Sequence, residues 1–136
     1  MIDKEIIKIA SNTENHGVLN NHTHSSKLKN AICGDEMTIY LILQGDIVKD
    51  FKYECESCIY CQASVSLFSR KVKNRPVDKI KTFAEQAKKS FENETIYFDK
   101  EWKEFDKIMK KNNISRKECL LLPIKTTLEA INKKNL

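Results

Sequence analysis

Apolar and polar residues alternate along residues 37–43, a period of two that is typical of a strand with one buried face. The apolar positions are Met37, Ile39, Leu41 and Leu43. Gly45 and Asp46 follow, and glycine in the first position favours a two-residue type II′ turn. A second strand then runs from Ile47 to residue 54, so the stretch predicts a β-hairpin.

On the second strand we expect Ile47, Phe51 and Tyr53 to face the core and Val48 to face the other way. Antiparallel pairing brings the start of the first strand and the end of the second to the same edge of the sheet. The residues just outside the hairpin, 33–35 and 55–61, are therefore expected to lie close together.

Helical spacing of apolar residues predicts four helices, over residues 3–11, 58–74, 76–89 and 99–111. Asp3 and Asp99 are suited to cap the first and the last of these, and Asn112 and Asn113 to stop the last. We expect Ser57 to cap the second helix, which places Cys58 in its first turn. There the unpaired N–H groups and the helix dipole stabilise a thiolate.

Near the C-terminus, Ser115 and Glu118 have the spacing of a capping box, so Cys119 is also expected in the first turn of a helix. Pro123 leaves two alternatives, since proline inside a helix costs about 3 kcal/mol. Either one helix kinks there, or a short turn holding Cys119 precedes a helix that begins at Pro123.

The remaining stretches are polar connectors. Residues 11–30 are rich in Asn and predict a loop, while residues 90–98 have some strand character. The predicted fold is α+β, a small antiparallel sheet of about three strands built around the hairpin and packed against several helices. We expect one domain over residues 1–136.

Composition narrows the classes of function. Hydrophobic residues make up 40% and charged residues 32%, and no apolar run approaches the roughly 20 residues of a membrane helix. The N-terminus lacks the layout of a secretory signal, so we expect a cytoplasmic protein with no membrane partner. The net charge is +5, but the lysines are interleaved with acids, and nucleic acid is not an expected partner.

The five cysteines carry the candidate chemistry. Their odd number and irregular spacing make a poor disulfide framework, and clustered cysteines in a cytosolic protein more often bind metal or perform redox chemistry. Cys33, Cys58 and Cys119 fall at boundaries of predicted elements rather than within apolar stripes. One alternative is a zinc knuckle for nucleic acid built from Cys55, Cys58 and Cys61, but it lacks a second cysteine pair.

Three segments together resemble the family of U-type iron–sulfur cluster assembly scaffolds. Residues 31–36 (Ala-Ile-Cys-Gly-Asp-Glu) are similar to the family's Asn-Pro-x-Cys-Gly-Asp segment, and they precede the hairpin as in the family. Residues 53–64 resemble its aromatic-x-Gly-x-Gly-Cys-x-x-x-x-Ala-Ser segment, and residues 116–123 resemble the region of its third cysteine. The resemblance spans roughly residues 1–132.

The resemblance implies that Cys33, Asp35, Cys58 and Cys119 hold a metal ion or a nascent 2Fe–2S cluster. It also implies a scaffold that is not an enzyme, with a cysteine desulfurase as sulfur donor and apo iron–sulfur proteins as clients. A carboxylate in place of a fourth thiolate would make the cluster easier to release. The alternative with the same ligands is a zinc-bound sulfurtransferase that accepts persulfide and activates the desulfurase.

The sequence departs from the family pattern at several positions. Cys55 and Ser57 stand where the family has glycine. Cys61 is an additional thiol, and three interpretations of it stay open: an alternative ligand, a persulfide relay, or no role. Glu118 replaces a histidine found in one group of the family, and we interpret it as a capping residue. That group's Leu-Pro-Pro-Val-Lys chaperone motif is missing, which favours the longer, sulfur-mobilisation type of scaffold.

Overall fold

The computed structural model describes residues 3–32, 34–92 and 97–133. The elements in chain order are α1 (Lys4–Ala10), β1 (His24–Lys29), β2 (Glu36–Gln44), β3 (Ile47–Glu56), α2 (Ile59–Lys71), α3 (Val77–Ser90), the 3₁₀ helices η1 (Lys100–Lys107) and η2 (Lys111–Arg116), and α4 (Lys117–Asn132). The three strands form one antiparallel sheet in the order β1-β2-β3. The predicted α+β class is confirmed.

The hairpin of β2 and β3 is present with the predicted turn. Gly45 takes φ +58°, and Asp46 keeps a negative φ, which is the combination of a type II′ turn. Glu36 pairs with Glu56 at the open end of the hairpin. Asp35 and residues 57–58 therefore lie at one edge of the sheet, as the sequence predicted.

The predicted orientation of Val48 is wrong. Val48 is fully buried and Ile47 is only half-buried, because the register shifts between Ile42, which pairs with Asp50, and Leu43, which pairs with Val48. The extra residue, Lys49, forms a β-bulge that reverses the side-chain alternation beyond it.

The third strand of the sheet comes from residues before the hairpin, not from residues 90–98, for which the sequence indicated some strand character. Residues 24–29, expected in a loop, form β1 and pair with β2 from His24 opposite Leu41 to Lys29 opposite Glu36. The described part of 90–98 contains no strand, and residues 93–96 lie outside the described residues. β1 escapes recognition because it is an edge strand whose one buried residue is a serine, Ser26.

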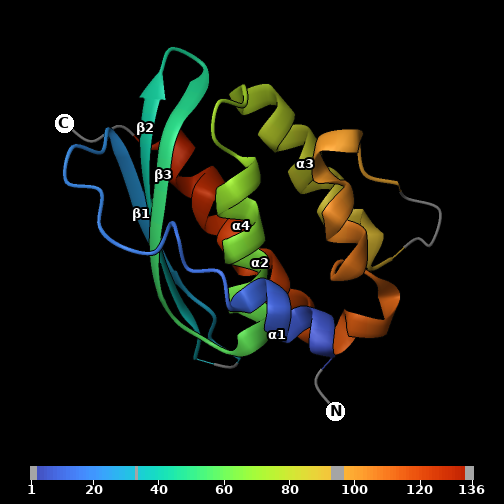
Figure 1. Ribbon diagram of the computed structural model, residues 1–136. Coiled ribbons are helices and arrows are strands. Elements are labelled where there is room, and N and C mark those ends of the chain that lie inside the picture. The colour runs from blue at the N-terminus through green and yellow to red at the C-terminus, as the bar shows by residue number, and fades with distance from the viewer. Residues whose placement is uncertain (1–2, 33, 93–96, 134–136) are drawn as a thin grey trace.

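The molecule is layered (Figure 1). α2 and α4 cover one face of the sheet, and α3 with η1 packs on their far side. The segment between α1 and β1 crosses the other side of the sheet. It is fixed to β3 by Gly17 N–H, which donates to the Tyr53 carbonyl at 2.8 Å, and to β2 by Thr23 N–H, which donates to the Leu41 carbonyl at 2.8 Å.

Several helix starts and stops differ from prediction. Asp3 caps α1 as expected, since its Oδ1 accepts from Glu5 N–H at 2.9 Å. Cys58 rather than Ser57 is the N-cap of α2. Residues 100–107 form a 3₁₀ helix rather than an α-helix, and Asp99 makes no side-chain cap.

The C-terminal capping box does not form. Ser115 lies inside η2, Arg116 is the N-cap of α4, and Glu118 Oε2 instead accepts from Lys125 Nζ at 2.9 Å. The interpretation of Glu118 as a capping residue is therefore wrong. Pro123 lies inside one continuous helix, so the alternative of a helix beginning at Pro123 is also wrong.

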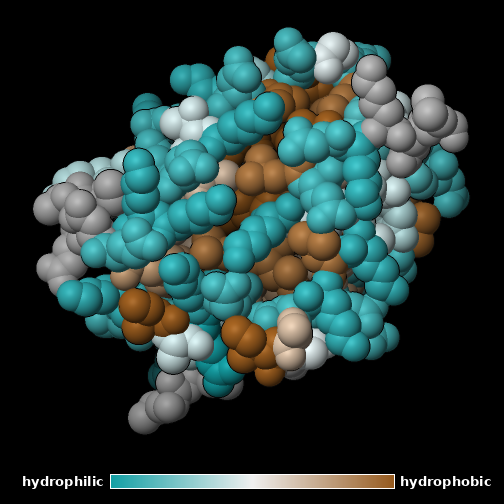
Figure 2. All heavy atoms as spheres, turned by 180° about the vertical axis from the view of Figure 1, so that it is seen from behind, coloured by the Kyte–Doolittle hydropathy of each residue, from teal (hydrophilic) through white to brown (hydrophobic). Residues whose placement is uncertain are grey.

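One hydrophobic core joins the sheet to the helices. At its centre Phe68 of α2 contacts Phe51 of β3 edge-on, and Phe83 of α3 stacks on Trp102 of η1 at 4.3 Å. Figure 2 shows the rear face, where hydrophilic residues predominate and apolar surface appears as a narrow band between them. No helix in the described ranges combines the length and apolar character that crossing a membrane requires.

Candidate metal centre

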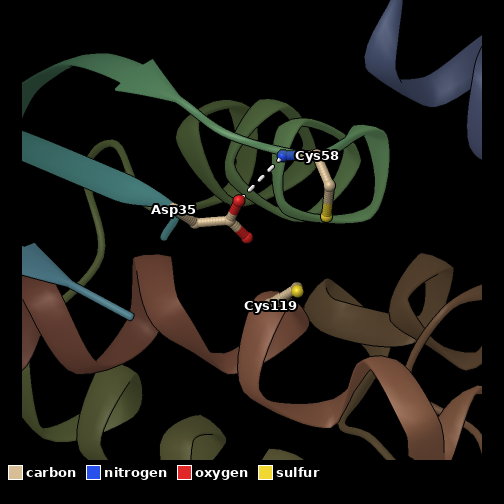
Figure 3. A group of neighbouring side chains, drawn as sticks. All are labelled: Asp35, Cys58 and Cys119. Atoms are coloured by element: carbon tan, nitrogen blue, oxygen red, sulfur yellow. Dashed lines mark hydrogen bonds between the residues drawn. The ribbon is translucent and has the colours of Figure 1, made fainter. Parts of the chain in front are cut away.

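Three predicted site residues converge at the edge of the sheet (Figure 3). They are Asp35 before β2, Cys58 at the start of α2 and Cys119 in the first turn of α4. One ligand atom from each, a carboxylate oxygen and two Sγ atoms, lies within 4.8 Å of the other two. Asp35 and Cys119 are buried and Cys58 is half-buried, so Cys58 is the member of the group most accessible to solvent.

Asp35 is presented by a tight loop between β1 and β2. Asn30 closes this loop, since its carbonyl accepts from Gly34 N–H and its N–H donates to the Asp35 carbonyl, each at 2.7 Å. Its Oδ1 also accepts from Ile32 N–H at 3.0 Å. Gly34 has φ +72°, a conformation in which any other residue would be strained. Gly34 belongs to the Cys-Gly-Asp segment that resembles the family's, whereas Asn30 was not among the predicted site residues, although Asn before a turn is a known signal.

Cys58 is linked to Asp35 through its backbone. Its N–H donates to Asp35 Oδ1 at 3.1 Å (dashed in Figure 3), and its carbonyl accepts the first helical bond of α2 from Gln62 N–H at 3.0 Å. As N-cap it has an extended backbone, and its side chain makes no capping hydrogen bond. The thiol therefore turns towards Asp35 and Cys119 rather than over the helix end.

Cys119 is positioned by the contact between α2 and α4. Ser64 Oγ in α2 donates to the carbonyl of Leu120 at 2.6 Å, and both residues are fully buried. This bond fixes the first turn of α4 against the first turns of α2. The Arg116 guanidinium lies over the ring of Tyr60 at 5.2 Å and closes the same contact at the surface.

The donor set fits a thiophilic metal. Thiolates with a carboxylate suit zinc or iron–sulfur clusters rather than magnesium or calcium. In a tetrahedral zinc site with Zn–S bonds of about 2.3 Å the sulfur atoms lie about 3.8 Å apart. Ligand atoms already within 4.8 Å of one another need only a small adjustment to meet on one ion.

Cys33, the fourth predicted ligand, lies outside the described residues. Its neighbours in the chain belong to the loop that presents Asp35.

Cys55 and Cys61 do not join the group. Cys61 is fully buried, and burial raises the pKa of its thiol. Cys55 is half-buried, and its pKa is also raised, chiefly by burial and further by the nearby Asp35 carboxylate. Both side chains therefore favour the neutral thiol, which is not the form that binds metal.

The zinc-knuckle alternative is not supported by this geometry. Across residues 3–32, 34–92 and 97–133, the one group of at least three Cys, His, Asp or Glu side chains gathered in this way is Asp35, Cys58 and Cys119. This group includes Cys58 but neither Cys55 nor Cys61, the other two cysteines of the proposed knuckle.

Comparison with known proteins identifies the family. Residues 1–94 match the NifU-like N terminal domain family. The chain is 33% identical to the iron–sulfur cluster assembly scaffold protein IscU of Thermotoga maritima, over 98% of this chain and 94% of that protein. It is 36% identical to the zinc-dependent sulfurtransferase SufU of Bacillus subtilis over 67 residues, 49% of this chain and 45% of that protein.

Solved structures agree with the sequence matches. A nitrogen-fixing NifU-like protein (N-terminal part) from Brucella abortus superposes with a TM-score of 0.88 at 22% identity, over 95% of this chain and 90% of that one. A candidate iron–sulfur cluster assembly scaffold protein for the SUF system from Fervidobacterium islandicum gives 0.86 at 26% identity, over 96% of both chains. This chain belongs to the NifU-like N-terminal domain family, the U-type iron–sulfur cluster assembly scaffolds that its sequence motifs predicted.

Proposed function

We propose that this protein assembles an iron–sulfur cluster on Cys33, Asp35, Cys58 and Cys119 and hands it to apo-proteins. In this proposal sulfur comes from the persulfide of a cysteine desulfurase. The protein is a scaffold without turnover of its own, and the cluster is its cargo rather than a resident cofactor.

The observation that supports the proposal most directly is the convergence of Asp35, Cys58 and Cys119. These residues come from three separate elements, yet their ligand atoms lie within 4.8 Å of one another. Two thiolates with one carboxylate match the chemistry of iron–sulfur ligation. The family and the Thermotoga maritima relative named for cluster assembly support the same function.

The carboxylate suits a scaffold better than an electron carrier. An aspartate oxygen is a harder and weaker ligand for iron in a cluster than a thiolate, so it is the point at which the cluster can be released. Cys58 is the half-buried member of the group, and it is the ligand that a donor or client protein could reach most easily.

Chemical reconstitution tests the proposed ligand set. Anaerobic incubation with ferrous iron and sulfide should give the visible absorption of a cluster in the wild-type protein. The variants Cys33→Ser, Cys58→Ser and Cys119→Ser should each lose it. Cys61→Ala is the matched control, because it removes a thiol one helical turn from Cys58 that lies outside the group, and it should keep the absorption. Full reconstitution in all three serine variants would overturn the proposal.

A zinc-bound sulfurtransferase is the second candidate, favoured by the similarity to the Bacillus subtilis SufU over about half of this chain. The same ligands would hold zinc, and one thiolate would accept persulfide and so accelerate a desulfurase. Its distinguishing result is a faster desulfurase reaction with zinc-loaded protein and no acceleration after zinc is removed by a chelator.

A further inference from the structure

The positive charge of this chain is concentrated in one segment. Residues 107–117 contain five of the 24 Lys and Arg residues and no Asp or Glu, so the rest of the chain carries 19 basic and 19 acidic residues. The net charge of +5 therefore belongs to this segment alone. We call it the basic segment, and its cations are Lys107, Lys110, Lys111, Arg116 and Lys117.

The basic segment lies on the surface. No residue in the range 110–117 is buried, whereas Met109 before it and Cys119 after it are buried. η2 is consequently a surface element held between two buried points, and Figure 1 shows it in orange just before the start of α4. Ile114 lies within η2 and is 53% exposed, so the surface presents an apolar side chain among its cations.

Acids around the segment balance its charge only weakly. Lys110 forms no ion pair with the residues that the structure describes. Lys117 Nζ lies 3.7 Å from Glu92 Oε1, and a long ion pair at the surface contributes little. The next acid in the chain, Glu118, is already engaged by Lys125 at 2.9 Å. The basic segment therefore presents a positive field to the solvent.

The same segment flanks the candidate metal centre. Lys117 is two residues before the ligand Cys119 in the first turn of α4. The Arg116 guanidinium lies over the ring of Tyr60, which is two residues after the ligand Cys58. A molecule that covers the basic segment is therefore next to both thiolate ligands.

We propose that the basic segment is the surface on which a client apo-protein docks to take the cluster, and that this client presents acidic residues around an apolar contact for Ile114. The inference rests on the proposed function for the nature of the cargo. Complementary charge steers an acidic protein to this face and orients it there. A second copy of this chain does not fit, because two such faces would repel each other.

A client fits this surface better than a sulfur donor does. A donor delivers one sulfur atom on a single thiol, whereas a client must bring several thiolates to the cluster and hold them there. Transfer is then a ligand exchange. Client thiolates replace the carboxylate and thiolates of this chain, the protons of the client thiols pass to the released ligands, and no atom changes its oxidation state. A fixed contact beside two of the ligands that are replaced favours this exchange.

Cluster transfer to an acidic acceptor tests the docking surface. The probe is the apo form of a plant-type 2Fe–2S ferredoxin with a strongly negative net charge, and visible circular dichroism follows the appearance of its cluster after mixing with the reconstituted protein. We expect the double variant Lys107→Glu with Lys110→Glu to transfer its cluster about tenfold more slowly than the wild type at low salt. The difference should shrink as the ionic strength rises from about 0.01 M to about 1 M, since the screening length falls from about 30 Å to about 3 Å.

The double variant Lys79→Glu with Lys81→Glu is the matched control. It makes the same change in net charge on two exposed residues of α3. The start of α3 is tied to the hairpin turn, where Val77 N–H donates to the Asp46 carbonyl at 2.7 Å, at the end of the sheet away from the metal centre. This variant should transfer its cluster at the wild-type rate. Release of the cluster to dithiothreitol, a neutral thiol, should be equal in both double variants and the wild type, because it requires no docking.

The apolar contact is tested on its own. Ile114→Ser should slow transfer several-fold at every salt concentration, because it removes apolar surface and no charge. Ile114→Val keeps most of that surface and should transfer near the wild-type rate. The cluster absorption of each variant before mixing establishes that it is folded and loaded.

Transfer to the ferredoxin at the wild-type rate in the Lys107 and Lys110 double variant would overturn the inference. So would an equally slow release to dithiothreitol, which would mean that the charges act on the cluster and not on docking. Unchanged transfer together with slower sulfur loading from a cysteine desulfurase, or with lost binding of a labelled RNA, would assign the surface to that other partner instead. The proposed function is tested separately, because reconstitution of the wild-type protein from ferrous iron and sulfide needs no acceptor protein.

Discussion

Asp35 has two roles that a single substitution can separate. Its Oδ1 accepts a hydrogen bond from the backbone of Cys58, and a carboxylate oxygen also belongs to the group with the two Sγ atoms. The first role orders the start of α2, and the second supplies a ligand.

Asp35→Asn should keep the hydrogen bond and lose the ligand, since an amide oxygen still accepts from Cys58 N–H but carries no charge. Loss of an outer-shell partner of a metal ligand already costs about 10- to 100-fold in affinity, so we expect zinc affinity to fall by at least that much. Competition with a chromophoric chelator measures it. Glu36→Gln makes the same chemical change one residue away, on a half-buried side chain that pairs with Lys27 and lies outside the group, and it should leave the affinity intact. Equal affinities for Asp35→Asn and wild type would exclude the carboxylate as a ligand.

At this scale the sequence predicted much of the site. Cys58 and Cys119 were identified by their positions at element boundaries, and both lie in the observed group. The predicted caps Ser57 and Glu118 were wrong because cap formation depends on local geometry. A cysteine occupies the N-cap of α2, and the partner of Glu118 is Lys125, seven residues further along α4.

At the scale of elements, β3 is covered along its outer edge by the segment after α1. Tyr53 exchanges backbone hydrogen bonds with this segment, since its N–H donates to the Asn15 carbonyl at 3.2 Å and its carbonyl accepts from Gly17 N–H. The rings of Tyr53 and His16 meet edge-on at 5.4 Å. Tyr53 is consequently 3% exposed, and burial, with the adjacent Cys55, raises its pKa from 10.0 to about 12.

This shift predicts a loss of stability in alkali. Above pH 10 the unfolded state loses the Tyr53 proton while the folded state retains it, so the free energy of unfolding should fall as pH rises from about 10 to 12. Urea unfolding across this range measures the fall, and Tyr53→Phe should make it shallower. Part of the pH dependence of the free energy of unfolding should persist in Tyr53→Phe. The reason is Tyr40, whose hydrogen bond to Glu54 raises its pKa to about 12 as well.

The exposed Tyr97 provides the control, as Tyr97→Phe should leave the dependence as it is in the wild type. An unchanged slope in Tyr53→Phe would show that burial of Tyr53 does not govern the alkaline transition.

Elements whose own residues have a clear hydrophobic periodicity were predicted well. Elements whose conformation is set by contacts with neighbouring elements were not. The hairpin and the apolar stripe of α3 carry their own periodicity. β1 is a strand because β2 pairs with it, the bulge at Lys49 reverses Val48, and residues 100–107 wind as a 3₁₀ helix while Trp102 stacks on Phe83. None of these arrangements is encoded in a local pattern.

At the scale of the whole molecule, the fold brings together segments that are far apart in the chain. The antiparallel hairpin places Asp35 beside Cys58, and the packing of α4 on α2 brings in Cys119 from the last quarter of the sequence. The site therefore depends on the tertiary structure rather than on one contiguous motif, unlike a zinc knuckle.

The measurement that tests this account most directly is the metal and sulfide content of the protein purified without oxygen. A cluster scaffold should carry iron and acid-labile sulfide in equal molar amounts. Stoichiometric zinc with no acid-labile sulfide would contradict the scaffold function and favour the zinc-bound sulfurtransferase.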